Sequence, residues 1–188
     1  MIGYALCGSY CTHAASLATL TLLRRQGYEV QPILSEHAYS TDTRFGTAAS
    51  LVSRLEELCA RAPIHTIVEA EPLGPKTPLE ALVIAPCTGN TLSKIAHGIT
   101  DTAVCMAAKA HLRTDRPLLI ALASNDAMSA NLCNIGTLLC KKSVYFVPMH
   151  QDDYRNKPHS LVADFSQLPD CLRATLDGKG QRRPLFLE

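Results

Sequence analysis

Short apolar segments alternate along the chain with turns and with segments of helix length. The first unit is an apolar run over 2–7, a Gly-Ser turn at 8–9 and helical spacing up to Arg25. A second apolar run over 28–34 follows Gly27, which gives a strand–helix–strand unit with parallel strands and a right-handed crossover. Because helices cover both faces of such a sheet, the pattern predicts a buried parallel sheet.

The same alternation continues through most of the remaining chain. Further strands are expected at 64–68, 81–85, 117–123 and 144–147, and further helices at about 47–61, 92–96, 102–112, 127–140 and 168–176. The sequence therefore predicts one α/β domain over residues 1–188, with helices on both faces of a parallel sheet of about six strands. The tail from about residue 178 is polar enough to fray.

Composition limits the partners of the chain. A formal net charge of +1 gives no general attraction to nucleic acid or to an anionic membrane surface. The first apolar run lacks the basic flank of a secretory signal, and charged residues interrupt every candidate membrane span. The eight cysteines include no Cys-x-x-Cys pair, which favours reduced thiols in a cytoplasmic protein and gives no metal site.

Polar residues follow the ends of four predicted strands. In an open parallel sheet, ligands bind at the carboxyl edge, where such residues meet. Gly8 and Ser9 ahead of a helix suit a phosphate, although a simple glycine turn explains them equally well. Ser35 is compatible with phosphate binding and with an ordinary helix or turn cap. Because the full G-x-G-x-x-G spacing is missing, a monophosphate is favoured over a dinucleotide.

The segment 85–101, APCTGNTLSKIAHGITD, is the most informative part of the chain. Its turn offers backbone N–H groups and an amide that can both donate and accept, as the pyrimidine edge of a flavin requires. The alternative is an ordinary helix start with Thr88 or Asn90 as the cap.

This segment resembles the P-A-S-A-N-T and K-I-A-x-G-x-x-D motifs of the homo-oligomeric flavin-containing cysteine decarboxylase superfamily. The matching residues are Thr88, Gly89, Asn90, Thr91, Lys94 and Asp101. Within the superfamily, 41–46, 66–76, 106–109 and 145–153 are most similar to the B subunits of bacterial dipicolinate synthases, so that the resemblance extends to about residue 163. It implies a three-layer flavodoxin-like or Rossmann-like fold, bound FMN near a subunit interface, and homo-oligomers built from trimers.

The resemblance also assigns roles to individual residues. Gly8 and Ser9, helped by Ser35, would hold the FMN phosphate, and Thr88, Gly89 and Asn90 would face the isoalloxazine ring. The expected cofactor-binding residues are Gly8, Ser9, Tyr10, Ser35, Pro86, Cys87, Thr88, Gly89, Asn90, Lys94 and Asn125. Lys94 and Asp101 are equally suited to fixing the turn. Arg44 and Lys76 are candidates for binding substrate carboxylates, with a solvated surface charge as the alternative for each.

Two features of the decarboxylases have no counterpart here. Their catalytic His-Ile pair corresponds to Glu-Pro-Leu-Gly-Pro at 71–75, and their P-x-M-N-x-x-M-W clamp corresponds to 123–131, in a chain without Trp. The resemblance therefore does not imply decarboxylation of a peptidyl cysteine, and it assigns no catalytic residue.

What the resemblance implies is a flavin-binding subunit that acts with a dehydrogenase-like A subunit. Together they would oxidise a dihydrodipicolinate-type dicarboxylate to dipicolinate during sporulation, in the cytoplasm of the mother cell, with NAD(P) on the A subunit. Two alternatives stay open. One is an FMN-dependent decarboxylase or prenyl-flavin-type transferase, and the other is a non-catalytic structural partner of the A subunit.

Overall fold

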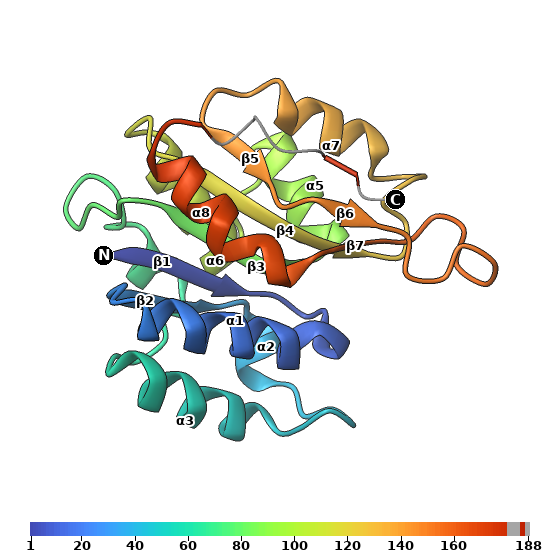
Figure 1. Ribbon diagram of the computed structural model, residues 1–188. Coiled ribbons are helices and arrows are strands. Elements are labelled where there is room, and N and C mark those ends of the chain that lie inside the picture. Colours follow the sequence, from blue (N-terminus) through green and yellow to red (C-terminus); the bar gives the residue numbers. More distant parts are fainter. Residues whose placement is uncertain (180–184, 187–188) are drawn as a thin grey trace.

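A computed structural model describes residues 1–179 and 185–186 (Figure 1). Its parallel strands are β1 (Ile2–Leu6), β2 (Val30–Leu34), β3 (Leu82–Cys87), β4 (Leu118–Ser124) and β5 (Val144–Phe146). They lie in the order β2-β1-β3-β4-β5. The short strands β6 (Met149–His150) and β7 (Leu161–Ala163) are antiparallel, and β7 pairs with the end of β4. Within the described residues the sheet has seven strands, so the predicted α/β fold is confirmed with a slightly larger sheet.

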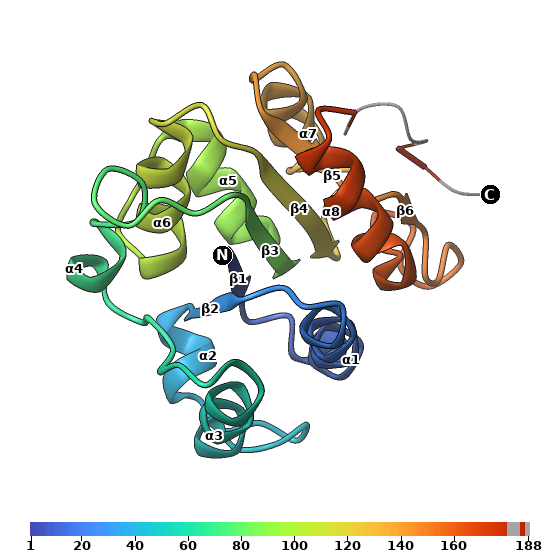
Figure 2. The ribbon, with the colours of Figure 1, turned by 60° about the vertical axis from the view of Figure 1, so that its left-hand side comes forward.

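Helices cover both faces of this sheet (Figure 2). On one face α1 (His13–Arg25) packs against α8 (Leu168–Leu176). On the other face lie α5 (Gly89–His97), α6 (Ala103–Leu112) and α7 (Leu132–Leu139), while α3 (Ala48–Cys59) packs beside β2 at the sheet edge. The predicted three-layer arrangement is confirmed. None of the helices in the described part of the chain is long and apolar enough to cross a bilayer.

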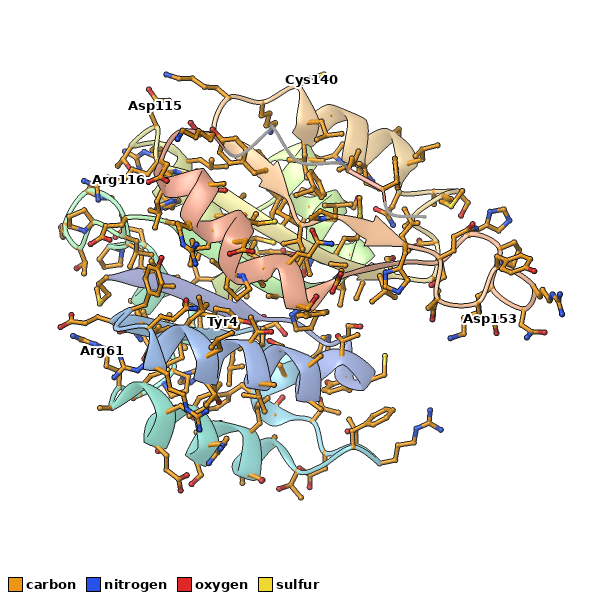
Figure 3. All side chains as sticks on the ribbon, in the orientation of Figure 1. Tyr4, Arg61, Asp115, Arg116, Cys140 and Asp153 are labelled. Atoms are coloured by element: carbon orange, nitrogen blue, oxygen red, sulfur yellow. The ribbon has the colours of Figure 1, made fainter. Side chains whose placement is uncertain are left out.

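The central strands are apolar along their whole length because both of their faces are covered. Every residue of β1 and β3 is buried. A polar link crosses this core: the Tyr4 hydroxyl donates to the Ser16 carbonyl (3.1 Å), and the Ser16 hydroxyl donates to the Ala85 carbonyl (2.5 Å). Burial raises the pKa of Tyr4 far above its usual value, so the phenol stays neutral in the core (Figure 3). The link joins α1 to β1 and β3.

The predicted strand at 64–68 is wrong. Only Ile64 pairs with the sheet, through an isolated bridge to Ile33, and the short helix α4 (Ile67–Ala70) follows. Thr66 and Glu69 explain the difference, because each side chain accepts a hydrogen bond from the backbone N–H of the other (3.2 and 3.1 Å). This reciprocal capping box starts a helix inside an apolar, β-branched run.

Other boundaries differ for local reasons. The helix α2 (Glu36–Ser40) forms directly after Ser35, which caps it. Strand β3 continues through Pro86 and Cys87, which were expected in a turn, and α5 already begins at Gly89. The helix predicted from residue 127 begins at Leu132, after a turn. Short 3-10 helices, η1 (Tyr10–Thr12) and η2 (Phe165–Gln167), precede α1 and α8. The predicted frayed tail lies mostly outside the described residues.

Gly74 should be required for stability. Its φ is +126°, and a Cβ at this position would overlap the carbonyl oxygen of Ala110 in α6. We expect Gly74→Ala to lower the free energy of unfolding by about 2–4 kcal/mol, measured by equilibrium urea denaturation.

Gly136 provides the matched control for this substitution. It lies within α7, and a Cβ there meets no atom within 4 Å. Gly136→Ala should raise the free energy of unfolding by up to about 1 kcal/mol, because alanine is the better helix former. Equal unfolding midpoints for the two variants would contradict this account.

Candidate functional site

The carboxyl ends of β1, β2 and β3 lie level with one another. The backbone N–H of Ser35 donates to the Leu6 carbonyl (3.0 Å), and that of Cys7 donates to the Pro86 carbonyl (3.1 Å). The loops that follow the three strands therefore leave the sheet side by side. The chain turns to opposite sides after β1 and after β3, because β1 leads to β2 and β3 leads to β4. Such a switch point is where open α/β sheets bind their ligands. We call this edge the rim.

The loop after β1 presents unused backbone donors to the rim. Ser9 N–H donates to the Cys7 carbonyl (2.9 Å), and the Ser9 carbonyl accepts from the Thr12 N–H (3.1 Å), which starts η1. Across the described residues, the backbone N–H groups of Gly8, Tyr10 and Cys11 make no hydrogen bond. Buried or half-buried N–H groups need acceptors, and those at a helix start suit an anion such as phosphate.

Ser35 and Tyr10 hold the neighbouring α2 in place. The Ser35 Oγ accepts a hydrogen bond from the Ala38 N–H (3.3 Å), so the structure shows the capping role. Capping uses only a lone pair of the oxygen, and the Ser35 hydroxyl can still donate to a ligand at the rim. The Tyr10 hydroxyl donates to the His37 carbonyl (3.0 Å), which ties η1 to α2.

The start of α5 supplies a second set of donors. Thr88 caps this helix, because its Oγ1 accepts from the Thr91 N–H (3.3 Å). Gly89 and Asn90 are the first two residues of the helix, so their N–H groups precede the first intrahelical hydrogen bond. The exposed Asn90 side chain makes no hydrogen bond to any described residue. The two N–H groups can donate to carbonyl oxygens of a ligand, and the Asn90 side-chain amide can both donate and accept.

Two thiols lie beneath these donors. The Thr91 hydroxyl donates to Cys7 Sγ (3.3 Å), and Cys87 ends β3 beside it. Burial raises the pKa of Cys7 to about 12 and raises that of Cys87 well above its usual value. Both groups are therefore neutral thiols at physiological pH, so they add no negative charge beneath the rim.

The loop after β4 packs directly against Gly89. A Cβ on Gly89 would lie 2.6 Å from Asn131 Nδ2 and 2.8 Å from Asp126 Oδ1, and it would overlap Ser124 Oγ. A side chain at this position would displace these three groups. The Ser124 hydroxyl donates to the Asp126 carboxylate and, with Asn131, lowers the pKa of Asp126 below its usual value.

The sequence places Asp126 directly after a predicted strand, at the edge where ligands bind, but only its neighbour Asn125 was among the expected cofactor-binding residues. The proximity of Asp126 to Gly89 depends on tertiary packing, which sequence spacing does not reveal. Asn125 itself is exposed at the rim.

Three other residues expected at the site, Lys94, Lys76 and Arg44, do not all lie at the rim. Lys94 Nζ forms an ion pair with Asp101 (2.9 Å), which fixes the end of α5 to the start of α6. Lys76 is exposed in the loop that leads into the start of β3, at the sheet edge opposite the rim. Arg44 is exposed between α2 and α3, with its guanidinium 4.9 Å from the centre of the Phe45 ring.

One cavity adjoins the rim at Tyr10 but does not coincide with it. It has a volume of about 300 Å³ and lies between α1, the loop at 41–47 and α3. Of the expected cofactor-binding residues, Tyr10 alone lines it.

The chain is similar to several known proteins. It is 42% identical to the B subunit of dipicolinate synthase from Bacillus subtilis over 187 residues, which cover all of this chain and 93% of that protein. The crystal structure of the corresponding B subunit from Bacillus halodurans superimposes with a TM-score of 0.90 and 39% identity, covering 100% of this chain and 95% of that one. DmrB of Burkholderia xenovorans, solved in complex with FMN, shares the fold with a TM-score of 0.67 and 21% identity, over 94% of this chain and 95% of that one.

A family model gives the same result. The model of the Flavoprotein family matches residues 1–151, a range that contains β1 to β5 and every residue of the rim described above. The chain therefore belongs to the Flavoprotein family, and over its whole length it is a homologue of the dipicolinate synthase B subunit.

Proposed function

We propose that the rim binds FMN. In this proposal the N–H groups after β1 and the hydroxyls of Ser9 and Ser35 hold the phosphate. The start of α5, with Thr88, Gly89 and Asn90, faces the ring. The observation that carries the proposal is the pair of unused donor sets, after β1 and at the start of α5, on either side of the switch point. Proteins of the same fold that were solved with FMN support it.

The chemistry of the rim suits a flavin better than a more highly charged ligand. The backbone donors after β1 sit at the start of a helix and favour one phosphate, while the donors at α5 are neutral and favour ring carbonyls. The thiols below are neutral as well. A bound flavin would supply the capacity to accept a hydride, and the chain would orient the ring and hold the substrate beside it.

The similarity to the B subunits of two dipicolinate synthases supports a more specific role. The chain would be the flavin-binding subunit of a dipicolinate synthase and would contribute to oxidising a dihydrodipicolinate-type precursor to dipicolinate during sporulation. The A subunit would be its partner and would carry NAD(P). Arg44, in the loop between α2 and α3, is the candidate within one subunit for binding a substrate carboxylate.

The loops around the rim also favour assembly with further copies of the chain. Large apolar side chains are exposed in the segments that follow β2, β4 and β6, among them Phe45, Met128, Leu132 and Tyr154. Exposed apolar side chains of this size are common in protein interfaces. A homo-oligomer built from trimers would cover these side chains and close the rim.

FMN affinity provides the first test. Ser9→Ala removes a hydroxyl that would bond to the phosphate, so the dissociation constant should rise about tenfold or more. Asn90→Ala removes one neutral contact to the ring, and the dissociation constant should rise severalfold. Both values are measured by quenching of FMN fluorescence on binding.

Ser53→Ala is the control for these variants. Ser53 is an exposed serine on α3, away from the rim, and the variant should bind FMN like the unmodified chain. Unchanged affinity in both Ser9→Ala and Asn90→Ala would contradict the proposed site.

Turnover provides the second test. With the A subunit of a dipicolinate synthase, NAD(P) and a dihydrodipicolinate-type substrate, we expect dipicolinate to form only when both subunits are present. Arg44→Ala should raise KM about tenfold, because a charge-assisted bond to a carboxylate is lost. Arg61→Ala, an exposed arginine at the opposite end of α3 (Figure 3), should leave KM unchanged. Full turnover by the A subunit alone would contradict the proposed role.

A further inference from the structure

Asp126 brings an unpaired negative charge to the rim. Two other carboxylates near the rim are already used: Glu36 accepts from the Ala103 N–H at the start of α6 (3.0 Å), and Asp101 pairs with Lys94. Asp126 lies within 4.0 Å of no cationic side chain in the part of the chain that the structure describes. Its side-chain hydrogen-bond partners, Ser124 and Asn131, are neutral, so no described side chain neutralises its charge.

A chain of neutral side chains holds this carboxylate in place. The Asn134 Nδ2 donates to Asn131 Oδ1 (2.9 Å), and both residues are 5% exposed. Because its oxygen is occupied, Asn131 turns its amide nitrogen toward Gly89 and Asp126. The Ser124 hydroxyl donates to the same carboxylate. Buried supports of this kind fix the position of a functional group.

The Asp126 carboxylate does not cap the start of α5. A negative charge near a helix start is generally favourable, and capping is the simplest role for Asp126. However, Thr88 already caps α5, and no backbone N–H of this helix donates to Asp126 among the described residues. Asp126 Oδ1 instead lies against the glycine that would face the ring.

We propose that Asp126 tunes the flavin, by opposing the build-up of negative charge on the ring at the start of α5. This inference rests on the proposed FMN site. The N–H groups of Gly89 and Asn90 would stabilise a negatively charged ring, and a carboxylate beside them counteracts this effect. The bound flavin would therefore be reduced less readily, and its reduced form would pass its electrons on more readily.

Sulfite binding measures this charge effect without any enzymatic turnover. The sulfur lone pair of sulfite forms a bond to N5 of oxidised FMN and places a negative charge on the ring, which bleaches the visible absorption. Asp126→Asn keeps the size of the side chain and removes the charge. We expect the sulfite dissociation constant of this variant to fall about tenfold or more, as expected for one unit charge acting over several ångströms near a protein surface.

Two further variants separate charge from position. Ser124→Ala removes a hydrogen bond that positions Asp126 but keeps the carboxylate, so its sulfite affinity should change less than that of Asp126→Asn. Asp115→Asn removes a carboxylate at the opposite edge of the sheet (Figure 3) and should change nothing. An equal gain in sulfite affinity in Asp126→Asn and Ser124→Ala would overturn the charge argument.

The FMN affinity of each variant distinguishes this inference from the proposed function. If the unmodified chain binds no FMN, the proposed function fails, and the role of Asp126 fails with it. If all variants bind FMN and sulfite affinity is the same in Asp126→Asn as in the unmodified chain, the FMN site stands and the tuning role of Asp126 is overturned.

Discussion

The register of β1 between β2 and β3 is the constraint on which the candidate site depends. Two backbone hydrogen bonds, from Ser35 to Leu6 and from Cys7 to Pro86, bring three strands to an end at the same level. A shift of one residue would turn the side chains of β1 to the opposite faces of the sheet and would separate the loops. The hydroxyl of Ser16, between Tyr4 and Ala85, stabilises the same register from the face covered by α1.

Much of the fold could be predicted from the sequence, because the central strands are buried on both faces. Continuous apolar runs of this kind are visible without any knowledge of tertiary structure, and they predict β1 to β5 within a few residues. The run at 64–68 is misleading, since the capping pair Thr66 and Glu69 makes a helix more stable there. The strands β6 and β7 have only two and three residues. β7 forms because β4 offers it a partner far along the chain, and β6 in turn pairs with β7.

The candidate site could be predicted in part. Gly8, Ser9, Ser35 and the segment 88–90 follow strands directly, so topology alone places them at one edge. Lys76 precedes its strand and therefore lies at the other edge. Asp126 gains its significance from the close approach of Gly89, which is a tertiary contact. The strand order β2-β1-β3-β4-β5, which creates the switch point, is a tertiary feature that the periodicity of the sequence does not reveal.

The two thiols under the rim have a consequence for any electron-poor ring bound above them. Deprotonated sulfur is a strong nucleophile, and an oxidised isoalloxazine is open to attack by one. Because the sheet excludes water from Cys7 and Cys87, both keep their protons at the pH of the cell. The fold can therefore use these sulfur atoms as packing material beneath the rim, and a ring bound there would meet neutral thiols instead of reactive thiolates.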